Sequence, residues 1–210
     1  MRTILFDLDG TLTDAGEGII NCAKLALEQL GLPVPGDAQM RAFVGPPLRD
    51  TFQKFGVRAK DVEKAVQIYR SRYVPIGMFE NHPYPGIQDM LAALKAEGHR
   101  LYVATSKPEE MAKAILSKFQ LDTYFDLICG ATMDASRDSK DKVIGYLLDQ
   151  IGLSESPVMI GDTKYDILGA AVHQIPAIGV SWGYGSPEEM RDAGAAAIAD
   201  SPAALLELLR

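Results

Sequence analysis

The alternation of short apolar segments with amphipathic ones from residue 84 onward constrains the fold more than any other feature of the sequence. The apolar segments have the length of single strands, and apolar residues recur at helical spacing between them. Such a chain forms right-handed strand–helix–strand units and a parallel sheet with helices on both faces. We predict strands at 100–105, 127–130, 157–160, 177–180 and 196–199, and helices at 87–97, 108–119, 140–151, 163–172 and twice in the C-terminal tail.

The segment from about residue 15 to 80 has a different pattern of apolar residues and contains no convincing strand. Apolar residues at helical spacing predict four helices, and Pro46 and Pro47 break the chain between the second and the third, because each removes a donor and fixes φ. We therefore predict a helical domain at 15–81, inserted into an α/β domain that consists of 1–14 and 82–210. The predicted helices of the insert are 17–30, a helix that ends near 43, 49–55 and 60–72.

The composition of the 210 residues is that of a soluble globular protein, with 47% hydrophobic and 23% charged residues. A net charge of −7 argues against nucleic acid as a partner, because phosphate backbones bind clustered Lys and Arg. No apolar run approaches the ~18 residues of a membrane span, and acids interrupt the first run too early for a secretory signal. We therefore expect a cytoplasmic protein, in which Cys22 and Cys129 are buried free thiols.

An acidic turn follows the apolar residues Thr3-Ile4-Leu5, which we predict to be the first strand. Alternate side chains of an extended chain share a face, so Asp7 and Asp9 are expected to point the same way. Two carboxylates so close repel each other unless a cation lies near them or one is protonated. A divalent ion with oxygen ligands resolves the repulsion, and Mg²⁺ is the usual ion where phosphate is present. The alternative is a solvated acidic turn.

Polar residues follow three of the predicted strands: Asp7 and Asp9 the first, Thr105-Ser106-Lys107 the second, and Gly161-Asp162 a third. The ligand site of such a sheet lies beyond the carboxyl ends of its strands, so the three clusters should meet on one rim. Asp162 and Asp166 are four residues apart at a helix start, which puts them on roughly the same side of its first turn. Capping of that helix is the alternative role for Asp162.

Two further residues have the chemistry of an anion site. The hydroxyl of Thr105 precedes a helix that could begin at Pro108, and the free amides there suit phosphoryl oxygens, unless Thr105 is only a cap. Lys140 opens a helix, where a cation is mildly unfavourable unless it meets an anion. A mobile surface lysine is the alternative for Lys140, and Lys142 is the rival residue for its role.

These residues resemble the four motifs of the haloacid dehalogenase-like phosphatases, with Asp7-Leu8-Asp9-Gly10-Thr11 as the first and Thr105, Lys140 and Gly161 to Asp166 as the others. The resemblance covers essentially the whole chain and implies a Rossmann-like parallel sheet core with an inserted helical-bundle cap. Three further segments resemble the branch of phosphoglycolate phosphatases and 5′-nucleotidase-like enzymes: 43–48, 80–86 and 182–186. One departure is Ser106, where many relatives carry asparagine.

The resemblance implies a Mg²⁺-dependent phosphomonoesterase that works through an aspartyl-phosphate. Asp7 would be the nucleophile, and Asp9 would protonate the leaving group and then activate water. Mg²⁺ would be held by the side chain of Asp7, the backbone carbonyl of Asp9 and the side chain of Asp162, with Asp166 in support. Thr105 and Lys140 would bind the transferring group while the cap excludes water. The predicted substrate contacts are Gly10, Thr11, Ser106, Lys107 and Arg49.

Arg49 follows the rigid loop Gly45-Pro46-Pro47-Leu48 and could grip a second anion of the substrate, or be a surface arginine at a helix start. We expect a small phosphorylated metabolite as substrate, neither nucleic acid nor membrane as partner, and a monomer or homodimer. The resemblance slightly favours nucleoside 5′-monophosphates over 2-phosphoglycolate as the substrate. The alternatives are a haloacid dehalogenase, a sugar-phosphate mutase of the β-phosphoglucomutase type, a receiver-type signalling domain and a catalytically silent binding protein.

Overall fold

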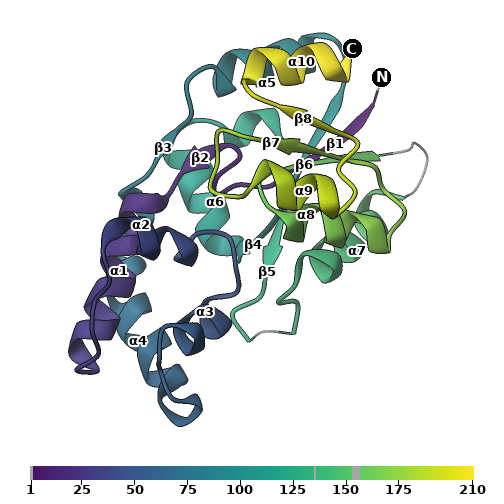
Figure 1. Ribbon diagram of the computed structural model, residues 1–210. Coiled ribbons are helices and arrows are strands. Elements are labelled where there is room, and N and C mark those ends of the chain that lie inside the picture. The colour runs from purple at the N-terminus through teal and green to yellow at the C-terminus, as the bar shows by residue number, and fades with distance from the viewer. Residues whose placement is uncertain (1, 135, 153–156) are drawn as a thin grey trace. The chain divides into compact units, whose positions relative to one another are not determined.

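The computed structural model describes residues 2–134, 136–152 and 157–210, which form two compact units (Figure 1). The helical unit is Asp14–His82, and the α/β unit joins the residues up to Thr13 to Pro83–Arg210. The chain passes between the units at two short strands, β2 (Thr13–Asp14) and β3 (His82–Pro83), which pair with each other. No helix in the described part of the chain has both the length and the apolar character needed to cross a membrane.

The α/β unit is built on one parallel sheet of six strands in the order β5-β4-β1-β6-β7-β8. Successive strands run outward from β1 to one edge, and the chain then returns to place β6 on the other side of β1. The order of strands therefore reverses between β1 and β6, and such a switch point opens a crevice at the carboxyl ends of the strands. The strands are β1 (Thr3–Phe6), β4 (Arg100–Pro108), β5 (Leu127–Ala131), β6 (Pro157–Gly161), β7 (Ala177–Val180) and β8 (Ala197–Ala199).

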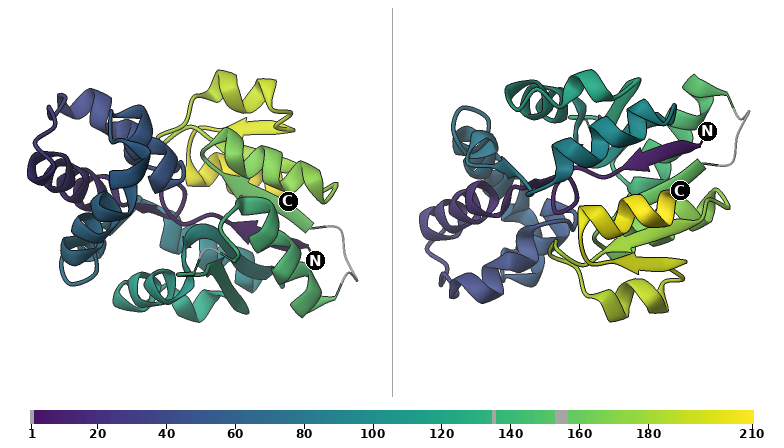
Figure 2. Two further views of the ribbon diagram at one scale, coloured as in Figure 1. Left: turned by 90° about the horizontal axis from the view of Figure 1, so that it is seen from below. Right: turned by 90° about the horizontal axis from the view of Figure 1, so that it is seen from above.

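Helices cover both faces of this sheet. Helices α5 and α10 lie side by side over one face, and α7, α8 and α9 lie over the other (Figures 1 and 2). A core cluster fills the second face: Leu5 and Met159 of the sheet pack with Val143 and Leu147 of α7 and Ile167 of α8. The helices are α5 (Ile87–Ala96), α6 (Glu109–Lys118), the 3₁₀ turn η4 (Asp122–Tyr124), α7 (Lys140–Ile151), α8 (Lys164–Val172), α9 (Pro187–Asp192) and α10 (Pro202–Leu209).

The helical unit is held together by an aromatic cluster and by the packing of α1 on α4. The ring of Phe52 lies 5.1 Å from that of Phe43 and 6.4 Å from that of Tyr69, between centroids. Its elements are α1 (Gly16–Gln29), α2 (Asp37–Met40), η1 (Arg41–Phe43), α3 (Leu48–Lys54), η2 (Ala59–Asp61), α4 (Val62–Tyr73) and η3 (Gly77–Phe79).

The fold class predicted from the sequence is confirmed, a parallel α/β sheet flanked by helices with a helical insert. Cys22 and Cys129 are buried free thiols, as predicted. Most predicted boundaries lie within one or two residues of the observed ones, and two elements differ more. Strand β4 runs on to Pro108 instead of ending at Thr105, with a break in register between these two residues. The predicted second helix of the insert is two shorter pieces, α2 and η1.

We predict that Phe52→Ala destabilises the protein by about 3–5 kcal/mol, the usual cost of deleting a fully buried aromatic side chain. Phe52 has 0% exposure and touches aromatic partners on two sides. Urea unfolding measures the loss, and Gln53→Ala, at an exposed position of the same helix, should stay within about 0.5 kcal/mol of the wild type. Equal losses in the two variants would contradict the packing described here.

Candidate active site

Three buried carboxylates meet at the switch point of the sheet. Asp7, Asp162 and Asp166 each bring a carboxylate oxygen within 4.8 Å of the other two. The backbone N–H of Asp7 donates to the carbonyl of Ile160 at 2.9 Å, which fixes the end of β1 against β6. The acids predicted to share one rim therefore lie together where the strand order reverses, in the crevice expected to bind a ligand.

Lys140 supplies the positive charge of this cluster. Its ammonium lies 2.8 Å from Oδ1 of Asp7 and 2.7 Å from Oδ1 of Asp166, and it donates to the carbonyl of Ala104 at 2.9 Å. Burial alone lowers the pKa of Lys140, but the charges of Asp166 and Asp7 outweigh it, and the net shift is upward. Lys140 is therefore charged and buried, not a mobile surface residue, whereas the rival Lys142 is exposed.

The start of α8 separates the roles of its two aspartates. Thr163 is the N-cap of the helix. Oδ2 of Asp166 accepts hydrogen bonds from the backbone N–H of Thr163 at 3.0 Å and from the hydroxyl of Thr163 at 2.8 Å, in a capping box. The alternative that Asp162 caps this helix is thus wrong, because Thr163 does so. Gly161 leaves space for the side chain of Asp166 in this arrangement, since a Cβ at position 161 would lie 2.2 Å from the carboxyl carbon of Asp166.

A loop after β7 lies over Asp162; sequence reasoning connected it with a branch of the family but did not assign it to the site. The backbone N–H of Tyr184 donates to Oδ2 of Asp162 at 2.8 Å, and the indole N–H of Trp182 donates to the carbonyl of Thr11 at 3.0 Å. A Cβ on Gly183 would lie 2.4 Å from Oδ2 of Asp162, so only glycine allows this approach. The signal that could have found the loop is a pair of glycines following a strand on the same rim.

The charges of the cluster fit a divalent cation. Among the described residues, three carboxylates face one ammonium, so negative charge is in excess. Burial, followed by the charges of Asp166 and Asp7, raises the pKa of Asp162 well above its usual range. Burial also raises the pKa of Asp166, although Lys140 opposes that shift. Oxygen ligands with surplus negative charge are what a hard divalent ion requires, so the buried cluster could hold one.

Thr105 and Lys107 lie at the end of β4. The hydroxyl oxygen of Thr105 accepts from the backbone N–H of Lys107 at 3.2 Å, so its proton can still be donated to another group. The ammonium of Lys107 forms an ion pair with Oδ2 of Asp9. Burial raises the pKa of Asp9, and Lys107 opposes that rise. Ser106, which lies between Thr105 and Lys107 in the sequence, is half-buried.

Gly10 and Thr11 lie beside Asp162. The hydroxyl of Thr11 donates to Oδ1 of Asp162 at 3.4 Å, and a Cβ on Gly10 would lie 2.2 Å from Oδ2 of the same residue. Arg49 belongs to the helical unit, where its Nε lies 2.6 Å from Oε1 of Glu63. A substrate anion at Arg49 would therefore compete with Glu63. The functional roles assigned to all these residues stay predictions.

The sequence matches a family model described as haloacid dehalogenase-like hydrolase over residues 4–180. The chain belongs to this family. It is 44% identical over 190 residues to a 5′-nucleotidase of Pseudomonas aeruginosa, covering 90% of this chain and 86% of the relative. A phosphoglycolate phosphatase of Aquifex aeolicus is 32% identical over 185 residues, which cover 88% of this chain and 86% of that protein. The predicted branch of the family is therefore confirmed.

Solved structures agree with this membership. A predicted phosphatase from Clostridium acetobutylicum superposes with a TM-score of 0.95 at 40% identity, covering 99% of this chain and 97% of that one. A relative with a different name is the tyrosine-protein kinase PtkA of Mycobacterium tuberculosis, 42% identical over 185 residues and 88% of this chain. The aligned region covers only 63% of PtkA. The family and these structural neighbours confirm the prediction of a hydrolase fold and family.

We predict that the metal-free protein loses stability as the pH rises above the ordinary range of an aspartic acid. Because the pKa of Asp162 is raised on folding, the folded state binds more protons than the unfolded state between the ordinary and the raised value. Stability falls with rising pH through that window. A divalent ion removes this penalty, so Mg²⁺ should raise the Tm more at pH 7.5 than at pH 5. At 100 times its dissociation constant, the ion stabilises the folded protein by about 2.7 kcal/mol.

Asp162→Asn serves as the matched variant for this measurement. It should raise the Tm of the metal-free protein at pH 7.5 and reduce the response to Mg²⁺, because it removes one buried negative charge. The exposed Asp149→Asn should leave both unchanged. A Mg²⁺ response that is the same in Asp162→Asn as in the wild type would place the ion elsewhere.

Proposed function

We propose that this chain is a Mg²⁺-dependent phosphomonoesterase that hydrolyses a small phosphate ester through an aspartyl-phosphate on Asp7. The observation that carries the proposal is the cluster of three buried carboxylates around the ammonium of Lys140, at the switch point of the sheet. The printed names of its relatives, 5′-nucleotidase and phosphoglycolate phosphatase, support the same reaction class.

In the first half-reaction an oxygen of Asp7 would form a bond to phosphorus while the bond from phosphorus to the ester oxygen breaks. The electron pair of that bond goes to the leaving oxygen, which takes a proton from Asp9. Burial raises the pKa of Asp9, which favours the protonated form that this step needs. Lys140 and the hydroxyl of Thr105 would stabilise the negative charge on the transferring group.

In the second half-reaction Asp9, now a carboxylate, would take a proton from water as the water oxygen bonds to phosphorus. The bond between phosphorus and Asp7 breaks, and inorganic phosphate and the carboxylate of Asp7 are the products. A divalent ion held by Asp7, Asp162 and the backbone carbonyl of Asp9, with Asp166 in support, would supply charge neutralisation to the phosphoryl oxygens when bound.

We further propose that 15–81 acts as a cap on a core domain of 1–14 and 82–210, which the separate compactness of Asp14–His82 supports. Within the substrate class we favour nucleoside 5′-monophosphates over 2-phosphoglycolate. The support is the 44% identity to a protein named 5′-nucleotidase, against 32% to one named phosphoglycolate phosphatase. Phosphorylation of tyrosine is the second candidate activity, since a protein named tyrosine-protein kinase is 42% identical over 88% of this chain.

A phosphate-release panel tests the proposed function. We expect Mg²⁺-dependent release of inorganic phosphate, fastest from nucleoside 5′-monophosphates, with slower release from 2-phosphoglycolate, sugar phosphates and p-nitrophenyl phosphate. EDTA should abolish it, because the carboxylate cluster would regain its excess charge. An isomeric product without free phosphate would instead reveal a mutase. Transfer of the γ-phosphoryl group of ATP to a tyrosine peptide, without ester hydrolysis, would favour the second candidate.

We expect Asp7→Asn to lower phosphate release from every ester by at least about 10³-fold, because loss of a nucleophile removes most of the catalysis. The amide keeps the shape of the side chain, so folding should survive. Asp149→Asn, at an exposed position of α7, is the matched control and should retain full activity. Turnover that persists in Asp7→Asn would overturn the assignment of the nucleophile.

A further inference from the structure

The mechanism above leaves one buried charge of the site without a task, the ammonium of Lys107. The side chain of Lys107 is 4% exposed and forms an ion pair with Asp9, whose side chain is 14% exposed. Sequence reasoning assigned Lys107 to substrate binding. Its ammonium instead lies against the residue proposed to carry the proton, so its position needs an explanation of its own.

An irregularity in β4 brings Lys107 to this position. Thr105 pairs with Gly130 of β5 and Pro108 pairs with Ala131, so two residues of β4 have no counterpart on its neighbour. In a regular strand the side chains of Thr105 and Lys107 would share one face. An insertion of this kind bends the strand and redirects side chains, and it often occurs beside an active site.

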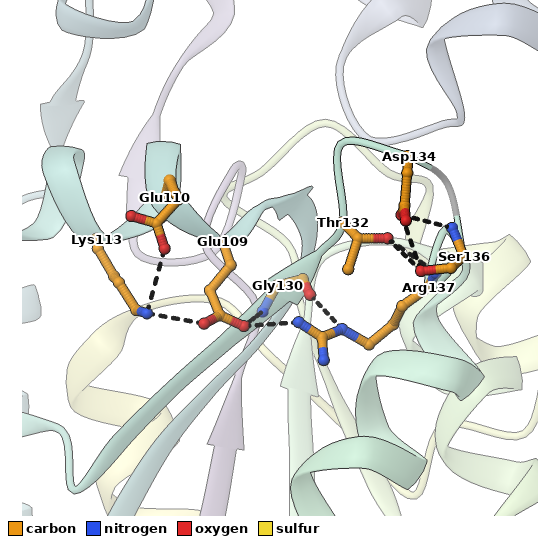
Figure 3. Close-up of polar contacts among 8 residues, drawn as sticks. All are labelled: Glu109, Glu110, Lys113, Gly130, Thr132, Asp134, Ser136 and Arg137. Carbon is orange, nitrogen blue, oxygen red and sulfur yellow. Dashed lines mark hydrogen bonds and ion pairs between the residues drawn. The ribbon is translucent and has the colours of Figure 1, made fainter.

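Gly130 and two charged side chains brace the irregularity from the side of β5 (Figure 3). A Cβ on Gly130 would lie 2.5 Å from the carbonyl oxygen of Lys107, so β5 can approach only because this residue is glycine. Oε2 of Glu109 accepts from the backbone N–H of Gly130 at 3.3 Å and from Arg137 at 2.7 Å. Arg137 donates to the carbonyl of Gly130 at 2.7 Å and stacks on the ring of Tyr146.

The two oxygens of Asp9 have different surroundings. Oδ2 is held by the ammonium of Lys107, whereas Oδ1 is buried and has no hydrogen-bond partner among the residues that the structure describes. A carboxyl group with one oxygen anchored cannot rotate freely about its terminal bond. Its second oxygen is thereby kept available in one orientation, and a buried polar atom left without a partner is costly unless it has a function.

We propose that Lys107 is a positioning residue for Asp9: its ammonium anchors Oδ2, so that Oδ1 gives the proton to the leaving oxygen and later takes one from water. Lys107 then acts through Asp9 and not on the phosphoryl group. This inference rests on the proposed function, in which Asp9 is the general acid and base. The braced irregularity of β4 is what keeps Lys107 at the required place.

Two esters without a second anionic group test the proposal, p-nitrophenyl phosphate and ethyl phosphate. Nitrophenolate leaves without a proton, whereas ethoxide needs one. Lys107→Met should therefore lower kcat/KM about tenfold more for ethyl phosphate than for p-nitrophenyl phosphate, part of the ~10²–10⁴-fold that a general acid contributes. Lys107→Arg, which keeps the charge, should recover part of the loss, and Lys118→Met, an exposed lysine of α6, should match the wild type.

The double variant separates positioning from direct binding. In an Asp9→Asn background, Lys107→Met should change the first-turnover release of nitrophenolate by less than about twofold, since residues that act as a unit are not additive. A further tenfold loss there, or equal losses for the two esters in Lys107→Met, would overturn the proposal. If Lys107→Met does not fold, Lys107→Gln replaces it: its shorter, neutral side chain anchors Asp9 less well, so it should show the same preferential loss with ethyl phosphate, to a smaller extent.

The proposed function has its own readout in the same series. If Asp9→Asn hydrolyses ethyl phosphate like the wild type, then Asp9 is not the general acid, and the proposed mechanism fails together with the inference. If Asp9→Asn loses ethyl phosphate hydrolysis while Lys107→Met keeps the wild-type ratio of the two esters, the mechanism stands and only the role of Lys107 is overturned.

Discussion

The ion pairs between Lys140 and the carboxylates of Asp7 and Asp166 are the contacts on which the rest of the α/β unit depends. Lys140 lies on α7, Asp7 follows β1 and Asp166 lies on α8. The ammonium of Lys140 also donates to the carbonyl of Ala104 on β4. Breaking a buried ion pair by removing one partner costs about 3–5 kcal/mol, because a charge is left uncompensated. The two ion pairs and the hydrogen bond to Ala104 therefore fix four elements at one point, at the reversal of strand order where a ligand would bind.

The carboxylate of Asp162 leaves no space for a side chain at two positions of the loops that surround it. A Cβ would lie 2.2 Å from a carboxylate oxygen of Asp162 at Gly10 and 2.4 Å from the same oxygen at Gly183. Both loops instead present backbone, and the N–H of Tyr184 donates to Asp162. The glycines thus allow two separate loops to close around acids that repel each other, and the backbone dipoles offset part of that repulsion.

The sequence predicted this sheet because its two periodicities, two for strands and 3.6 for helices, differ enough to be read along the chain. The carboxyl-end rule then placed Asp7 and Asp162 on one rim without any long-range information, and the four-residue spacing from Asp162 added Asp166. The features that could not be predicted depend on which of two adjacent residues takes a role, or on residues distant in the sequence. Asp162 and Thr163 are both good caps, and only the approach of the 182–185 loop decides between them. The insertion in β4 was missed because Lys107 and Pro108 are uncommon in strands, so the strand was predicted to end at Thr105.

Asp7 and Asp9 show how neighbours in sequence are given different chemistry. They are two residues apart, yet Asp7 faces the ammonium shared with Asp166, whereas Asp9 faces Lys107 and keeps one oxygen without a partner among the described residues. A carboxylate that must attack phosphorus benefits from a fixed charge beside it. A carboxyl group that exchanges protons, the role proposed for Asp9, benefits from burial that favours its neutral form, and burial raises the pKa of Asp9. Different surroundings for paired acids are how one site assigns separate roles to the same residue type. In this chain burial raises the pKa of Asp9, and Lys107, at the irregular end of β4, adds an ion-pair partner that contacts Asp9.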